Sequence, residues 1–395
     1  MIYLDANATT PLDARVLATV VAELQELGNA SSHHLAGRRA AAVVRRARHE
    51  VADLLGSDPN EVTFTSGATE ANNLALLGLQ PASDRCAVIC PRTEHAAVLE
   101  PVEALRRDGR PVCLLPVDAA GRLDLDDLER SLGPETLLVS VMAVNNETGV
   151  RANLAAISEV VHRAGAFLHT DATQLLAWGP VDVDALGVDL LSLSAHKMHG
   201  PVGAGALYVR RDVRHRLTPR VFGGAHEAGL RSGTLNTPAI AGLGQAAVLA
   251  VEDGVAAAAA VAGLRDHLAE LLAAECPGFV VHGAGTDRAP GTLNVALPHA
   301  PADQVLAGAP EIAASRGSAC SGGTERPSHV LSAMGVTAQE IDRSMRLSLH
   351  RATTRQEVIG AAQLLAASAA RVRQRNAEHP PTSAPSARTT YGGAR

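Results

Sequence analysis

Aromatic residues are scarce in this chain of 395 residues, where Phe, Trp and Tyr together make up 2%. A surplus of positive charge is also missing, since the formal net charge is −6 at pH 7. Binding to nucleic acid usually needs a basic surface, and single strands also need aromatic rings on which bases stack. The composition therefore argues against direct nucleic-acid binding.

Cysteines are few, odd in number and without paired spacing: Cys86, Cys90, Cys113, Cys276 and Cys320. Such a set argues against a disulfide framework and fits a reducing compartment. Four of the five carry no chemical signal, because Cys86, Cys90 and Cys113 fit buried strand positions and Cys276 merely follows an alanine-rich helix. Cys320 differs, because its neighbours are small and polar.

Long apolar segments are also missing, since no uninterrupted apolar run approaches the roughly 20 residues that span a membrane. The first residues lack the basic and apolar regions of a signal peptide. What is present is 46% hydrophobic residues, enough for a sizeable core in a chain of about two domains. The sequence thus predicts a cytoplasmic enzyme that does not bind membranes.

Strand and helix patterns alternate through the first two thirds of the chain. Strands are predicted at residues 62–65, 87–90, 112–117, 137–144, 166–170, 190–194 and 206–209, and helices at 94–107, 125–131 and 153–164. This alternation favours an α/β fold with a mostly parallel central sheet flanked by helices.

The remaining segments complete the predicted organisation. We expect a large domain at residues 13–255, and a smaller α+β domain formed by residues 1–12 and 256–375. A long helix over 253–275 is expected to connect the two domains. Residues 376–395 are rich in Pro, Ser, Thr, Gly and Arg, which predicts a disordered tail.

The segment after the first large-domain strand has the features of an anion site. Residues 66–70 (Ser-Gly-Ala-Thr-Glu) link a β-branched strand to a helix. Free N–H groups and the helix dipole at such a turn favour a phosphate. The alternative is a plain helix cap, in which Thr69 caps its own helix.

A lysine directly follows the apolar strand at 190–194. Residues 190–200 read Leu-Leu-Ser-Leu-Ser-Ala-His-Lys-Met-His-Gly. A buried amine is costly unless it is paired or reactive, so Lys197 is a candidate Schiff-base lysine with Ser194 and His196 on a phosphate. The alternative is a solvated lysine. Asn146 and Asp171 also follow predicted strands, where parallel sheets bind ligands, and this favours the first interpretation.

Taken in order, these segments resemble one known family, the cysteine desulfurases of the bacterial NifS/IscS-like group. These are pyridoxal-phosphate enzymes of the class V aminotransferases. The resemblance lies at residues 3–11 (Tyr-Leu-Asp-Ala-Asn-Ala-Thr-Thr-Pro), 65–73, 144–149, 169–174, 194–201, 229–235, 317–321 (Gly-Ser-Ala-Cys-Ser) and 345–349. It implies the fold-type I architecture of pyridoxal-phosphate enzymes and a homodimer with active sites at its interface.

The resemblance also assigns roles to individual residues. It implies pyridoxal 5'-phosphate as cofactor, with Lys197 as its Schiff-base partner and His95 as a ring-stacking proton shuttle. Asp171 would pair with the ring nitrogen, and Arg346 would bind the substrate carboxylate. The implied cofactor-binding set is Ala68, Thr69, His95, Asn146, Asp171, Gln174, Ser194, His196, Lys197 and, from the partner subunit, Thr234.

Cys320 distinguishes the possible activities. A thiol on a loop of small residues suits a nucleophile that attacks the substrate's sulfur and carries it to an acceptor protein. The resulting hypothesis is a desulfurase that converts L-cysteine to L-alanine. An aminotransferase or C–S lyase with Cys320 incidental is the alternative within the same fold, and a non-catalytic scaffold protein is the alternative outside it.

A glycine pattern and a histidine pattern each resemble a known kind of binding site, and the end of the chain bears on the acceptor protein. The glycines of residues 200–205 lack the acidic partner of a dinucleotide site, and His196 and His199 lack the ligands that would complete a metal site, so neither is expected. The chain's end lacks the apolar segment with which family members dock an iron–sulfur scaffold. The identity of the acceptor is left open.

Overall fold

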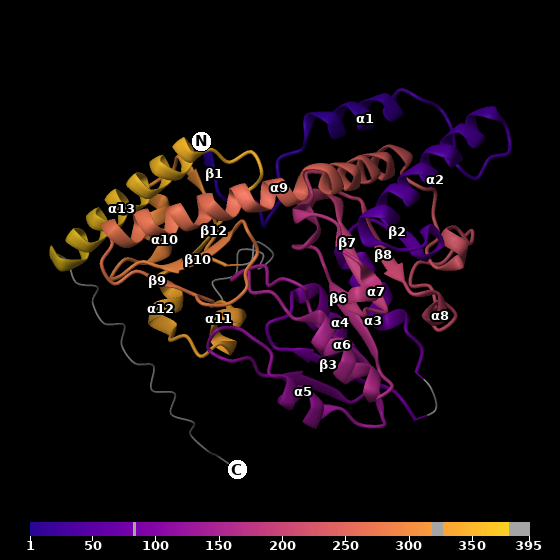
Figure 1. The fold of residues 1–395 in the computed structure, drawn as a ribbon, viewed down its shortest axis with the longest axis horizontal. Helices are drawn as coiled ribbons and strands as arrows, with labels where there is room; N and C mark the ends of the chain where they lie inside the picture. Colours follow the sequence, from indigo (N-terminus) through magenta and orange to yellow (C-terminus); the bar gives the residue numbers. More distant parts are fainter. Residues whose placement is uncertain (82–83, 318–326, 379–395) are drawn as a thin grey trace, which may run out of the picture.

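The computed structural model describes residues 1–81, 84–317 and 327–378. Two layered bodies lie side by side in Figure 1, joined by one long helix, α9, that passes along both. The body that holds most of the first two thirds of the chain contains a large sheet. The other body contains a smaller sheet and the last helices, and the N-terminal strand joins it.

The large sheet has seven strands in the order β2-β8-β7-β6-β5-β3-β4. Its strands are β2 (Val62–Thr65), β3 (Ala87–Pro91), β4 (Val112–Leu115), β5 (Thr136–Ser140), β6 (Phe167–Asp171), β7 (Leu190–Ser194) and β8 (Gly205–Val209). Only β8 runs against its neighbours β7 and β2. The predicted mostly parallel sheet is thereby confirmed.

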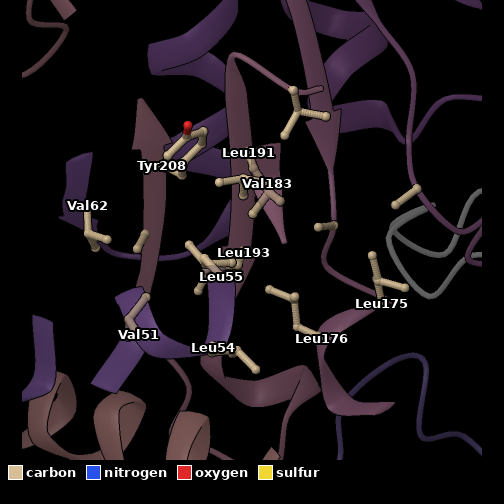
Figure 2. Close-up of a cluster of buried hydrophobic side chains, with 14 of the residues drawn as sticks. Val51, Leu54, Leu55, Val62, Leu175, Leu176, Val183, Leu191, Leu193 and Tyr208 are labelled. Atoms are coloured by element: carbon tan, nitrogen blue, oxygen red, sulfur yellow. The ribbon is translucent and has the colours of Figure 1, made fainter. Parts of the chain in front are cut away.

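Successive residues of the strands face opposite sides, and each side has its own core. Val88 and Leu138 pack among apolar residues with α3 and α4, whereas Ile89 and Val139 pack with α2, α6 and α9. Figure 2 shows part of the second core, where Leu55 of α2 lies near Leu193 of β7. The helices of this body are α1 (Ala14–Leu24), α2 (Leu35–Leu55), α3 (Ala68–Gly78), α4 (Ala96–Arg107), α5 (Leu125–Ser131), α6 (Leu154–Arg163), α7 (Val183–Leu186), α8 (Arg211–Arg214) and the first part of α9 (Thr237–Glu275).

Strand β5 ends at Ser140, four residues before its predicted end. Beyond that point, the Val141 and Ala143 N–H groups still donate to carbonyls of the β6 segment. The Met142 N–H instead donates to a carboxylate oxygen of Glu94 at 2.6 Å, because strand β3 has already ended. A side chain thus takes the place of the missing strand, next to the pocket described below.

Helix α9 begins at Thr237, 16 residues before the predicted start at 253. Glycines at 242 and 244 gave this part a poor helical pattern. The structure gives the reason for both glycines. A Cβ at Gly242 would lie 2.6 Å from a side-chain carbon of Val20 in α1, and one at Gly244 would lie 2.8 Å from the Cα of Ala47 in α2.

The same helix is long and apolar enough, by length and composition, to cross a membrane. Its buried residues are divided between the two bodies. Leu243 and Ala247 belong to the core of the large sheet, and Leu268 and Leu272 belong to the core of the smaller body. Its apolar composition is therefore explained in part by packing within the protein.

The smaller body is built on a three-stranded antiparallel sheet in the order β12-β10-β9. Its elements are β9 (Val280–Val281), β10 (Thr292–Ala296), α10 (Ala302–Ala307), β11 (Ile312–Ala313), α11 (His329–Ala333), α12 (Ala338–Asp342), β12 (Ser344–Ser348) and α13 (Arg355–Glu378). The chain's first strand, β1 (Ile2–Tyr3), pairs with β11. Helix α13 extends to Glu378, three residues into the segment for which disorder was predicted.

Candidate active site

A pocket of about 330 Å³ opens where strands of the large sheet end and the segment after β1 passes over them. Ten of the predicted site residues line it: Ala68, Thr69, His95, Asn146, Asp171, Gln174, Ser194, His196, Lys197 and Arg346. Thr234 is exposed and does not line this pocket. Cys320 lies outside the described residues. The sequence therefore identified most of the pocket's polar lining.

The turn between β2 and α3 forms one end of the pocket. Gly67 is the N-cap of α3, with φ of 153°, and no side chain caps the helix. The alternative in which Thr69 caps its own helix is thus wrong. A Cβ at Gly205 of β8 would lie 2.6 Å from the Cα of Gly67, so glycine there permits the close approach. The first N–H groups of α3 are left to face the pocket with Ser194, as a phosphate requires.

Glu70 also lines this end of the pocket and would repel a phosphate if its charge were not balanced. The Arg231 guanidinium lies 2.8 Å from one carboxylate oxygen of Glu70, and the Ser66 N–H donates to the other at 2.8 Å. This ion pair neutralises the carboxylate beside the anion site.

Lys197 lies in the short 3₁₀ turn after β7, at the floor of the pocket. Its Nζ donates to the carbonyl oxygen of Ala8 at 2.7 Å and to that of Asn7. The prediction did not include these two residues, although they belong to the N-terminal motif. One sequence signal was also missed: Lys197 is the only lysine in the chain.

Asp171 ends β6 and lies buried at the same edge of the sheet. Its carboxylate accepts the Thr173 N–H at 3.0 Å on one oxygen and the Asn72 side-chain amide at 2.7 Å on the other. Asn72 lies in the predicted motif at 65–73 but had no assigned role. The described residues place no Arg, Lys or His within ion-pair distance of Asp171. This carboxylate is therefore suited to a cationic group of a ligand.

Two histidines of the pocket are fixed by their neighbours. His95 is the N-cap of α4, and its Nδ1 accepts the Ala97 N–H at 3.0 Å. Because that nitrogen accepts, the neutral ring carries its proton on Nε2. Burial and the nearby Lys197 lower the pKa of His196 to about 4, so this ring is neutral at pH 7. The Nε2–H of His95 can therefore donate a hydrogen bond to a ligand.

Arg346 reaches the pocket from β12 of the smaller body and is 1% exposed. Its guanidinium lies 2.7 Å from a carboxylate oxygen of Asp5 and donates to the carbonyl of Asn146 at 3.1 Å. Its buried Nε has no hydrogen-bond partner among residues 1–81, 84–317 and 327–378. The prediction anticipated Arg346 at the site, but not its ion pair with Asp5.

Asn7 joins the two bodies at the pocket. Its N–H donates to Ser348 Oγ and its amide to Thr292 Oγ1, both at 2.9 Å and both in the smaller body. The same amide donates to the Asn146 carbonyl at 3.0 Å, and its own carbonyl accepts from Gln174 at 3.1 Å. The pocket thus depends on a residue near the start of the chain.

The donor set fits a pyridoxal-phosphate-like ligand. It combines an amine, an uncapped helix N-terminus suited to a phosphate, and a buried carboxylate suited to a pyridinium. These groups line a single pocket. They would not fit a metal ion, and among the described residues no cluster of three or more His, Cys, Asp or Glu is placed to hold one.

Comparison with known proteins identifies the family to which this chain is similar. The family model for aminotransferase class-V matches residues 2–359. A "Cysteine desulfurase" of Frankia sp. (strain EuIK1) is 46% identical over 94% of this chain and 92% of its own length. A "Cysteine desulfurase IscS" of Anaeromyxobacter dehalogenans is 44% identical over 90% and 89%. A solved "NIFS-LIKE PROTEIN" superposes with a TM-score of 0.85 at 34% identity, covering 93% of this chain and 98% of its own.

Proposed function

Since the chain belongs to the aminotransferase class-V family and is a cysteine desulfurase, we propose that it releases sulfur from L-cysteine in the pocket around Lys197. One observation carries the assignment of the pocket. The chain's single lysine, a buried carboxylate with no cation partner among the described residues and an uncapped helix N-terminus all line the same cavity. Few other chemistries need these three groups together.

Members of this family depend on pyridoxal phosphate, and we propose the same cofactor here. Its phosphate would lie on the N–H groups of Ala68 and Thr69, with the side chains of Thr69, Ser194 and His196. Its ring nitrogen would face Asp171, its ring would stack on His95, and Asn146 and Gln174 would hydrogen-bond its phenolic oxygen. When bound, it supplies an electron sink for charge that develops on the substrate's Cα.

The chain's own residues would then bind and orient the substrate. Arg346 is proposed to bind the carboxylate of L-cysteine, since it lines the pocket and a guanidinium fork matches that group. Lys197 would hold the cofactor and then move the Cα proton. His95, with its proton on Nε2, is positioned to donate that proton rather than to accept one there.

The sulfur is proposed to leave through Cys320, which lies outside the described residues. The thiol of Cys320 forms an S–S bond with the substrate's sulfur as the C–S bond breaks. L-Cysteine and one enzyme thiol give L-alanine and one enzyme persulfide, so atoms and electrons balance without another reactant. The persulfide sulfur then passes to an acceptor protein.

A homodimer is proposed as the working form, with Thr234 completing the partner's phosphate site. Val202 lines the pocket and yet is 76% exposed, and Phe222 is 81% exposed. Leu24, Leu27 and Leu35 around α1 and α2 are also exposed. Exposed apolar side chains such as these suit burial by a second copy of the chain. We place the enzyme in the cytoplasm, without membrane or nucleic-acid partners.

Replacement of Cys320 tests the desulfurase chemistry. The Cys320→Ser enzyme should keep the absorbance of bound cofactor but form no L-alanine from L-cysteine. A Cys86→Ser enzyme is the control, since that thiol lies at the start of β3, away from the pocket. Undiminished turnover of the Cys320→Ser enzyme would indicate an aminotransferase or C–S lyase. Transfer of labelled sulfur from persulfide-loaded enzyme would identify the acceptor.

A further inference from the structure

Asn72 is a fully buried amide at the lining of the pocket, where it holds another lining residue, Asp171. It lies on α3, and its Nδ2 donates to Oδ2 of Asp171 at 2.7 Å, which joins α3 to the end of β6. Its Oδ1 is buried and has no hydrogen-bond partner within the described part of the chain. Asn72 therefore makes one strong contact and leaves its carbonyl oxygen unsatisfied.

This arrangement is costly for folding. The neighbours of Asn72 on the buried face of α3 are apolar, including Ala71, Leu74 and Ala75 in the core below the sheet. Leaving a buried carbonyl oxygen unpaired costs free energy that an apolar side chain would not lose. The hydrogen bond to Asp171 compensates for this cost in folding free energy. This implies that the role of Asn72 is to hold the Asp171 carboxylate rather than to pack in the core.

The surroundings of Asp171 show why its carboxylate needs a donor. Burial lowers the pKa of His169 to about 4, so this neighbour is neutral at pH 7, and burial raises the pKa of Glu94 well above its usual value. Within residues 1–81, 84–317 and 327–378, the hydrogen bonds to the Asp171 side chain come from the Thr173 backbone and from Asn72. Both donors are neutral, and each holds one oxygen.

We propose that Asn72 is a positioning residue that holds the carboxylate of Asp171 oriented toward the ring nitrogen of the cofactor. The inference rests on the proposed function, because it needs pyridoxal phosphate in this pocket. An amide N–H can only donate, so in the observed orientation it holds the carboxylate oxygen Oδ2 of Asp171 in place. With one donor on each oxygen, rotation of the carboxylate is also opposed.

Cofactor binding to Asn72→Leu and Asn72→Ala enzymes tests this role. The dissociation constants of pyridoxal phosphate and of an analogue with C–H in place of the ring nitrogen are measured by equilibrium dialysis. Loss of a hydrogen bond to a charged group should weaken binding of pyridoxal phosphate about 10- to 100-fold. Binding of the analogue should be nearly unchanged, because it has no nitrogen to pair with Asp171.

Asn294 provides a matched control for the cost of altering a buried amide. It is also fully buried, donates one hydrogen bond, to the Glu147 carbonyl at 3.2 Å, and leaves its Oδ1 without a partner among the described residues. The Asn294→Leu enzyme should bind both ligands as the wild type does. Thermal unfolding of all variants shows that the compared proteins are folded.

The isosteric Asn72→Asp enzyme adds a spectroscopic readout. Two carboxyl groups at 2.7 Å would share a proton, so the pH dependence of the bound cofactor's absorbance should shift relative to the wild type. Equal weakening of both ligands, or no weakening, would overturn the role of Asn72 while wild-type binding stands. Failure of the wild type to bind pyridoxal phosphate would overturn the proposed function and this inference together.

Discussion

The pocket has two walls that are held in different ways. The sheet wall (Asp171, Ser194 and Lys197) lies where neighbouring strands end, and the sheet's own hydrogen bonds fix its backbone. The arm wall (residues 5–10 with Arg346) is fixed by contacts between segments about 340 residues apart, such as Asp5 with Arg346.

Because of this difference, substitutions in the two walls should affect the reaction and the stability of the fold to different extents. On the sheet wall, a side chain can be removed while the strands keep their pairing, so a substitution should affect reaction more than folding. On the arm wall, the same side chains orient the pocket and join the two bodies. Substitutions there should affect folding and reaction together.

Lys197→Ala is expected to give the largest effect. Formation of L-alanine should fall by about 10³-fold or more, because no other amine is placed to hold the cofactor and move the proton. The free energy of unfolding should change by less than about 1 kcal/mol, as for a half-buried side chain on an intact sheet. Urea unfolding and an alanine assay measure the two effects.

A chemical control uses the lack of any other lysine in the chain. Borohydride reduction of the cofactor-loaded wild type should leave one covalent label, found by peptide mass spectrometry at Lys197. A label that persists on a peptide of the Lys197→Ala enzyme would show that this lysine is not the attachment point.

Asp5→Ala tests the arm wall at its ion pair. The substitution leaves the guanidinium of Arg346 buried and unpaired, which should lower the free energy of unfolding by about 3 kcal/mol. The KM for L-cysteine should also change, because the same guanidinium is proposed to bind substrate. Asp5→Asn keeps an acceptor for Ser315 and should cost less. A loss below about 1 kcal/mol would contradict the coupling of the two bodies through this pair.

Asn7→Ala removes the amide that bonds to Thr292 and Asn146 but keeps the carbonyl that faces Lys197. Two lost hydrogen bonds predict a decrease of about 2 kcal/mol in the free energy of unfolding. Thr292→Val in a double-mutant cycle shows whether the effects are coupled. Additive effects would mean that the bond between Asn7 and Thr292 contributes nothing.

His199 lies where the two walls meet. Its Nδ1–H donates to the Pro11 carbonyl at 2.8 Å, and its ring lies 5.9 Å from the ring of His350. Burial and the nearby Arg351 lower its pKa to about 4 in the folded protein, against 6.5 when unfolded. The unfolded chain therefore binds more protons below pH 6.5, and stability falls with pH between 6.5 and 4.

The His199→Gln enzyme should consequently lose less stability on acidification. Between pH 7 and 5.5 its loss should be smaller than that of the wild type by about 1 kcal/mol, from urea unfolding at each pH. The remaining loss reflects the other histidines whose pKa is lowered by burial, which are His169, His196, His282 and His350. Identical losses in both proteins would show that His199 does not contribute.

The sheet wall was predictable because parallel strands end at one edge, so polar residues that follow successive strands must meet. Asp171, Ser194 and Lys197 were found in this way. The arm wall was not predictable from spacing, since Asp5 and Asn7 acquire their roles only when the chain's two ends meet. The start of α9 was missed because its glycines at 242 and 244 reflect close packing against α1 and α2 rather than helix propensity.

The contacts of Asn7 also set an order of events during synthesis. Asn7 leaves the ribosome among the first residues, whereas Ser348, which accepts its N–H, is made 341 residues later. The large sheet can form earlier, but the arm can settle over Lys197 only once β12 exists. A nascent chain that stops before residue 344 would therefore carry every sheet-wall residue and still lack a finished pocket, which would delay cofactor capture until translation is almost complete.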